Sequence, residues 1–191
     1  MLKRPFAVLA MLLGLLPLAS TTAYAANPRV KLITNFGLIV VELYPEQAPE
    51  SVKNFLRYVQ EGHYNGTLFH RVISGFMIQG GGFDRDFKQK PTGSPIKNEA
   101  GNGLKNLAGT LAMARTSDPN SATAQFFINV ADNAFLDHKD DSARGYGYAV
   151  FGKVVEGMDV VKRIEAVRTH SVGMFNDVPA EDAYIDKAEA F

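Results

Sequence analysis

The stretch of sequence that decides the fold and the site is Tyr64-Asn65-Gly66-Thr67-Leu68-Phe69-His70-Arg71-Val72-Ile73-Ser74-Gly75-Phe76-Met77-Ile78-Gln79-Gly80-Gly81. Its two apolar runs, Leu68–Ile73 and Phe76–Gln79, meet at the tight Ser74-Gly75 corner, which is typical of paired strands. Such a pair can bring a fixed cation, an aromatic wall, a flexible thioether and an amide onto one surface patch. The side chains concerned are Arg71, Phe76, Met77 and Gln79.

This patch holds no titratable base with an obvious partner, no carboxylate pair and no nucleophile. His70 precedes Arg71, but neighbouring residues of a strand point to opposite faces. We therefore interpret His70 as a packed, hydrogen-bonded histidine beside the patch. Asn65-Gly66-Thr67 matches a glycosylation sequon, which we interpret as a by-product of a turn.

Outside this stretch, two β-rich runs and two helical periods can be recognised. Arg29–Thr34 and Leu38–Tyr44 flank a short turn and predict a hairpin. Apolar residues recur with helical spacing between Pro49 and Gly62, and a second helix is predicted from Met158 to Val167. Further short strands are expected within Thr110–Arg115, Gln125–Val130, Tyr148–Val155 and Ala183–Phe191.

Many short strands with two isolated helices favour a closed or nearly closed antiparallel barrel, which leaves no exposed sheet edge. The same pattern would suit a β-sandwich with helices packed at its ends. Two long irregular stretches, Gly82–Gly109 and Asp132–Gly147, are of a length that is usually functional or mobile. The charged run at 137–141 within the second is interpreted as solvated surface.

Composition limits the classes of function. The 191 residues fit one domain with a short appendage, and 46% of them are hydrophobic, enough for a sizeable core. Twenty basic and twenty acidic residues balance, so nucleic acid is not an expected partner. The absence of cysteine excludes disulfides, thiolate catalysis and cysteine-ligated zinc.

The first 25 residues have the pattern of a secretory signal peptide. Lys3 and Arg4 precede an apolar run from Phe6 to Ala19, and Ala23 and Ala25 form a signal-peptidase site. An uncleaved anchor is the alternative, but the run is shorter than the ~20 residues of a spanning helix and contains a proline. We predict a signal peptide at 1–25 and a mature domain at 26–191, without stable membrane association.

The motifs resemble those of the cyclophilin-type peptidyl-prolyl cis-trans isomerases, and in particular the bacterial exported members. The resemblance covers essentially everything after the signal peptide, in the family's order and spacing. Beyond residues 64–81, it rests on Leu111–Arg115, Ser121–Asn129 and Val150–Val154. It implies a closed eight-stranded antiparallel β-barrel capped by two α-helices. It also implies an enzyme that accelerates rotation about X-Pro bonds with no cofactor and no metal.

The resemblance implies a role for each candidate residue. Arg71 would donate a hydrogen bond to the prolyl nitrogen of the twisted amide, with Gln79 and Phe76 beside it in the catalytic group. An apolar pocket for the proline ring would be formed by Phe76, Met77, Phe127 and Leu136. Gln79 and the backbone around Ala114 and Arg115 would hydrogen-bond the peptide, and Gln125 would support either Arg71 or the peptide.

Two positions at the rim depart from the pattern of many relatives. Phe135 stands where many carry Trp, and Tyr148 stands where many carry His, after an insertion rich in charge and glycine. Both residues keep the rim aromatic, so proline binding is expected to survive. The departures affect the expected binding of cyclosporin, the cyclic peptide inhibitor of many cyclophilins.

The expected substrates are proline-containing unfolded or partly folded polypeptides, and the protein is expected to be a monomer. The expected location is the periplasm, or the medium if the host lacks an outer membrane. A folding role for exported proteins follows from that location. Two other classes of function stay open: a binding module or holdase that uses the same groove without efficient turnover, and a lipocalin-type barrel, which would need a large apolar cavity.

Overall fold

The computed structural model describes residues 26–191, and the predicted signal peptide lies outside the described residues. The helices are α1 (Pro49–Gln60) and α2 (Met158–Glu165), with short 3-10 turns at η1 (Ala100–Asn102) and η2 (Ala134–Leu136). The strands are β1 (Arg29–Thr34), β2 (Gly37–Leu43), β3 (Thr67–Leu68), β4 (Arg71–Ile73), β5 (Met77–Gly80), β6 (Thr110–Met113), β7 (Phe126–Asn129), β8 (Val150–Glu156), β9 (Thr169–Val172), β10 (Phe175–Pro179) and β11 (Tyr184–Ala190).

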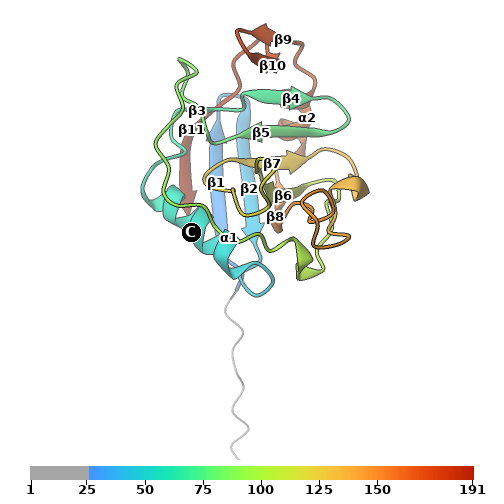
Figure 1. The fold of residues 1–191 in the computed structure, drawn as a ribbon. Helices are drawn as coiled ribbons and strands as arrows, with labels where there is room; N and C mark the ends of the chain where they lie inside the picture. The colour runs from blue at the N-terminus through green and yellow to red at the C-terminus, as the bar shows by residue number, and fades with distance from the viewer. Residues whose placement is uncertain (1–25) are drawn as a thin grey trace, which may run out of the picture.

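Nine of these strands form one curled antiparallel sheet in the order β3-β11-β1-β2-β8-β6-β7-β5-β4. In Figure 1, β1 and β2 run across the direction of β4, β5 and β7, as expected of a sheet that curls round on itself. The two end strands of the order, β3 and β4, are separated in the chain only by Phe69 and His70. The ends of the sheet therefore meet within one chain segment, although no backbone ladder joins β3 to β4.

This arrangement confirms the predicted mainly β fold with two helices and explains the strand count. The single run expected at Leu68–Ile73 divides in two, because Leu68 pairs with β11 and Arg71 pairs with β5. Gly80 permits the close approach at this point: a Cβ there would lie 2.9 Å from the Leu68 carbonyl oxygen. If β3 and β4 are counted as one strand that spans residues 67–73, the sheet has eight strands.

The inner face of the sheet is filled by side chains. Four residues that are paired across neighbouring strands belong to the main core, and each is at most 1% exposed. They are Val72, Ile78, Ile128 and Leu111. The helices lie apart (Figure 1), α1 against β8 and β11 and α2 against β2, β4 and β5. A packed interior excludes the large cavity that a lipocalin-type function would need.

Two features differ from the sequence-based expectation. The second helix ends at Glu165 rather than Val167, because the Val167 N–H already bonds the Ile164 carbonyl three residues back. The hairpin of β9 and β10 was not predicted, since β9 is largely exposed and lacks apolar alternation. Among residues 26–191, no helix has the length and apolar character needed to cross a bilayer.

Candidate active site

The candidate site is built on the outer face of four adjacent strands. The ladders pair Arg71 with Gln79, Gln79 with Phe127, and Phe127 with Ala112. Residues directly opposite one another in a sheet have side chains on the same face. The four residues therefore form one row across β4, β5, β7 and β6. Their chain neighbours face the core, so the alternation of period two separates the site from the interior.

A pocket of about 110 Å³ lies over this row. Nine of the eleven predicted site residues line it: Arg71, Phe76, Met77, Gln79, Ala114, Arg115, Phe127, Leu136 and Tyr148. Its floor is a small hydrophobic cluster, separate from the main core, that contains Met77, Phe127 and Leu136. The cation and the amide of the row thus stand at one side of an apolar cup.

Gln125 does not line the pocket, but its side chain is hydrogen-bonded to Gln79, which does. The Gln79 Nε2 donates to the Gln125 Oε1 at 2.9 Å, and the Gln125 carbonyl accepts the Ala114 N–H at 3.0 Å. Gln125 thereby links β5 to the backbone after β6. The chain at Gly82 passes so close that a Cβ there would lie 2.5 Å from the Gln125 side chain. The sequence left two roles open for Gln125, support of Arg71 or contact with the peptide. The hydrogen bond to Gln79 indicates a third role, support of Gln79.

The guanidinium of Arg115 is occupied by the protein itself. It donates to the carbonyls of Gly147 at 3.0 Å, Thr116 at 2.9 Å and Ala143 at 3.2 Å. It also lies over the ring of Tyr148, 4.6 Å from the centroid. Arg115 therefore connects the 138–147 insertion to the pocket wall, with three of its five N–H donors used within the protein.

The aromatic rim is formed by residues from separate segments. The ring of Tyr148 meets that of Phe127 edge-on at 5.7 Å, and the ring of Phe135 lies 5.4 Å from that of Phe76. Phe135 is 64% exposed and is not among the residues that line the pocket, so its predicted place at the rim stays a prediction. An exposed ring of this size beside an apolar cup is available to a bound molecule.

His70 is buried in the short link just before β4, as expected from its place beside Arg71. It is 6% exposed, its Nδ1 has no hydrogen-bond partner, and its ring packs edge-on against Phe83 at 4.7 Å. Burial, with a smaller contribution from the Arg71 charge, lowers the pKa of His70 to about 4 against a hydrogen bond to the Leu68 carbonyl. The imidazole is therefore neutral near pH 7 and faces away from the pocket.

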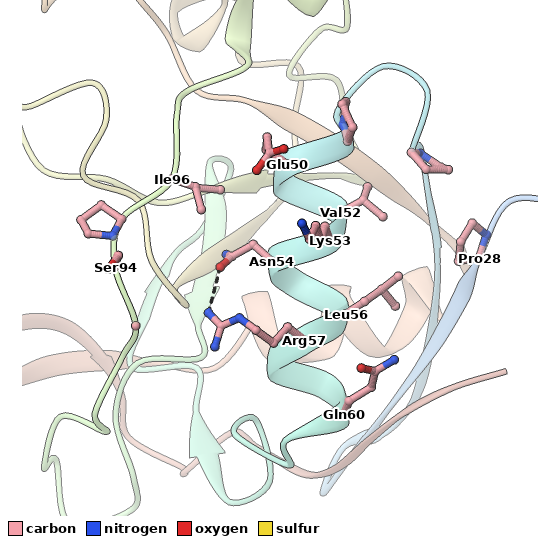
Figure 2. A pocket seen from close by; sticks show the side chains of 14 residues that line it. Pro28, Glu50, Val52, Lys53, Asn54, Leu56, Arg57, Gln60, Ser94 and Ile96 are labelled. Carbon is pink, nitrogen blue, oxygen red and sulfur yellow. Dashed lines mark hydrogen bonds between the residues drawn. The ribbon is translucent and has the colours of Figure 1, made fainter.

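A much larger cavity of about 840 Å³ lies elsewhere, between α1 and the segment around Ser94 and Ile96 (Figure 2). Its wall includes apolar residues such as Val52 and Leu56, and two of its polar residues, Asn54 and Arg57, are bonded to each other. Figure 2 shows the hydrogen bond from Arg57 to the Asn54 carboxamide oxygen, which measures 3.2 Å. No predicted site residue lines this cavity.

Two residues at the site were missed from the sequence. The Asp177 carboxylate, on β10, accepts a hydrogen bond from the Arg71 Nε at 3.4 Å. The Asn133 Nδ2 donates to the Phe76 carbonyl at 2.9 Å and so fixes the backbone of the pocket wall. Gly173 between two polar runs is a turn signal that could have indicated the β9–β10 hairpin, but nothing local connects it to Arg71.

In residues 26–191, no group of three or more His, Asp or Glu side chains is arranged to hold a metal ion. The curled sheet with a cation, an amide and an apolar cup on its outer face defines a protein of the cyclophilin class. Residues 29–190 match the family model described as cyclophilin type peptidyl-prolyl cis-trans isomerase/CLD. The chain belongs to this family.

The relatives agree with the family model. The chain is 62% identical over 153 residues to peptidyl-prolyl cis-trans isomerase B of Escherichia coli, covering 80% of this chain and 93% of that protein. It is 53% identical over 189 residues to peptidyl-prolyl cis-trans isomerase A of Dickeya dadantii, covering 99% and 98%. The protein is a peptidyl-prolyl cis-trans isomerase, and its substrates are proline-containing peptides.

The fold agrees with solved structures. A cyclophilin type isomerase of Cryptosporidium parvum superimposes with a TM-score of 0.71 at 27% identity, covering 86% of this chain and 98% of that one. A second structure of that protein, described as in the presence of the dipeptide Ala-Pro, gives a TM-score of 0.69 at 29% identity, covering 84% and 96%.

Proposed function

We propose that the pocket over the Arg71 row is the isomerisation site and that Arg71 is its principal catalytic residue. The observation that carries the proposal is the juxtaposition of an arginine and a glutamine with a small apolar cup. A proline ring fits an apolar cup of this kind, and the donors beside the cup can reach the amide that precedes the ring. Phe76, Met77, Phe127 and Leu136 would hold the ring.

The reaction needs no covalent step. Amide resonance gives X-Pro rotation a barrier of ~18–20 kcal/mol, and the uncatalysed change takes tens to hundreds of seconds. An enzyme lowers that barrier by binding the twisted amide more strongly than either planar form. Twisting localises the lone pair of the prolyl nitrogen, and the Arg71 guanidinium would donate a hydrogen bond to it. Each ~1.4 kcal/mol of such selective binding gives a tenfold gain in rate.

Gln79 and the backbone at Ala114 would hold the peptide on one side of the rotating bond. The hydrogen bond between Gln79 and Gln125 fixes the Gln79 carboxamide, so that its orientation does not have to be set when the peptide binds. Fixed contacts on one side and an open mouth on the other suit a reaction in which one end of the peptide turns. Phe135 and Tyr148 would form the rim of that mouth.

We further propose that the protein assists the folding of exported proteins, in the periplasm or in the medium, as a monomer without nucleic-acid partners. The support is the signal-like pattern of residues 1–25. The match to the Dickeya dadantii enzyme extends over nearly the whole chain and so includes most of that segment. Cleavage is expected after Ala25, because Ala23 and Ala25 fit signal peptidase.

Two experiments test these proposals. A protease-coupled assay on short X-Pro peptides, run with wild-type and Arg71→Ala proteins, separates an isomerase from a holdase: a holdase would bind unfolded chains equally well with both. N-terminal sequencing of the exported protein should find Ala26 first. A mature protein that retains Met1 would contradict both the cleavage and the location.

A further inference from the structure

The guanidinium of Arg71 is held from one side by a carboxylate more than one hundred residues further along the chain. The Arg71 Nε donates to the Asp177 Oδ2 at 3.4 Å. Within residues 26–191 this is the only hydrogen bond that the Arg71 side chain makes with the protein. Because arginine has five N–H donors, a bond at Nε leaves the four N–H groups of the two terminal nitrogens available to a bound peptide.

Asp177 stands where the backbone is unusual. Its φ is +60°, a conformation that residues other than glycine seldom adopt. The β9–β10 ladder is irregular at this point, between Phe175 and Val178. Left-handed residues persist when the surroundings hold them there, and they gather near functional sites.

The flanks of Asp177 show what holds it. Val178 is buried to 2% exposure, and the ring of Phe175 packs against Phe83 at 5.0 Å and Phe87 at 5.3 Å. Among the described residues, Asp177 and Phe87 are the two that are not glycine and have a positive φ, and the φ of Phe87 is +58°. The strand that carries Asp177 thus packs against the segment that carries Phe87, and β10 lies beside β4.

We propose that Asp177 is a positioning residue for Arg71. It fixes the long arginine side chain through Nε, so that the terminal nitrogens face the pocket before the peptide arrives. The inference rests on the proposed catalytic role of Arg71. Both side chains are about two-fifths exposed, 43% for Arg71 and 39% for Asp177. A pair this exposed contributes little to folding, so its effect should appear in turnover rather than in stability.

The chain offers a graded set of variants. Asp177→Asn keeps an acceptor and tolerates a positive φ but removes the charge, whereas Asp177→Gly removes the side chain and accepts the backbone conformation. We expect kcat to fall about two- to fivefold in Asp177→Gly and less in Asp177→Asn, with KM nearly unchanged. Asp182→Asn is the matched control, because Asp182 forms a similarly exposed ion pair, with Arg85 at 4.0 Å.

A double-mutant cycle with Arg71→Ala provides the decisive readout, with enzyme concentration raised to measure the slow variants. If Asp177 acts through Arg71, Asp177→Gly should lower kcat in the wild-type background and leave it unchanged in Arg71→Ala. The loss caused by Asp177→Asn should also shrink in ~1 M salt, because exposed charges are screened there. Circular dichroism checks that every variant is folded.

The possible outcomes separate the catalytic role of Arg71 from the positioning role of Asp177. An Arg71→Ala protein with near wild-type turnover would overturn the proposed function itself. If Arg71→Ala is slow but both Asp177 variants match the wild type, the positioning role is wrong and the role of Arg71 stands. An equal loss from Asp177→Gly in both backgrounds would assign Asp177 to the fold alone.

Discussion

Two pockets of the molecule differ in size by several-fold, and the proposed isomerisation site is the smaller of them. The α1 cavity measures about 840 Å³ and the Arg71 pocket about 110 Å³. Each is lined by an arginine of similar exposure, 41% for Arg57 and 43% for Arg71. What separates them is how the donors of each arginine are used.

Arg57 has committed its donors to its own helix. It bonds the Asn54 side chain at 3.2 Å (Figure 2). It also bonds the Glu61 carboxylate at 3.1 Å and lies over the Tyr58 ring, 4.1 Å from its centroid. Arg71 is held at Nε alone among the described residues, next to an apolar cup. A site is therefore marked by uncommitted donors beside an apolar wall, and volume by itself is a poor guide.

Exchanging each arginine for alanine gives the largest expected difference. Arg71→Ala should lower kcat about 10²- to 10³-fold with a smaller change in KM, as for loss of a donor that acts mainly on the transition state. Arg71→Lys should also be slow, because one ammonium does not reproduce the planar fork. Arg57→Ala should leave turnover at the wild-type level. The peptide assay measures all three, and equal rates for the two alanine variants would contradict the assignment.

Acidification should reveal a second difference, in how much two buried histidines, His70 and His63, contribute to stability. His70 has a pKa of about 4 when folded and about 6.5 when unfolded. Between these two pH values the unfolded chain binds more protons than the folded protein. The contribution of neutral His70 to the free energy of unfolding is therefore fully present above pH 6.5 and is lost as the pH falls toward 4. The loss should reach about 3 kcal/mol.

The ring of His63 packs against that of Tyr58 on α1, with centroids 4.7 Å apart, and burial lowers the pKa of His63 against a hydrogen bond to the Gly81 carbonyl. Denaturant unfolding between pH 4 and 7 should show that His70→Gln removes more of the acid sensitivity than His63→Gln does. The opposite ranking would show that His70 is less buried in solution than in the structure.

The rim of the small pocket should determine inhibitor binding more than turnover. Resemblance implies that Trp at the position of Phe135 donates its indole N–H to a cyclosporin carbonyl, whereas Phe has no donor. An unpaired buried carbonyl costs on the order of 1–3 kcal/mol, or about five- to more than a hundredfold in affinity. Phe135→Trp should tighten cyclosporin inhibition by that factor and change peptide turnover little. Equal, tight inhibition of both proteins would remove Phe135 from the rim.

The smallest difference is expected from a pair of glutamine variants. Gln125→Ala removes the acceptor that fixes the Gln79 side chain, so kcat/KM should fall about two- to tenfold. Gln60→Ala, in the lining of the α1 cavity, should have no effect on turnover. The peptide assay compares the two. A Gln125→Ala protein with wild-type kcat/KM would show that Gln79 orients itself without support.

Four of the eleven predicted site residues, Arg71, Phe76, Met77 and Gln79, could be named from the sequence because they lie within nine residues of one another. Residues 71–79 form one hairpin of neighbouring strands, and alternation alone puts Arg71 and Gln79 on one face. Phe127 could be named only by resemblance, since its place beside Gln79 depends on the pairing of β5 with β7. Pairing between distant strands has no local signal, because the register is decided by packing on both faces of the sheet.

The sequence by itself determined a mainly β chain with two helices and the residues of the patch around Arg71, while a barrel and a sandwich both stayed open until the resemblance was considered. The strands, the helices and the patch follow from periodicity and turn residues, which act over a few neighbours. Only the tertiary structure decided what lies across the chain. The Glu99 carboxylate accepts the Ser51 N–H at 2.8 Å and caps a helix that has no cap of its own. Asp177 likewise reaches Arg71 from β10. Both contacts join segments that are far apart in the chain and are brought together by the tertiary fold, which no local propensity encodes.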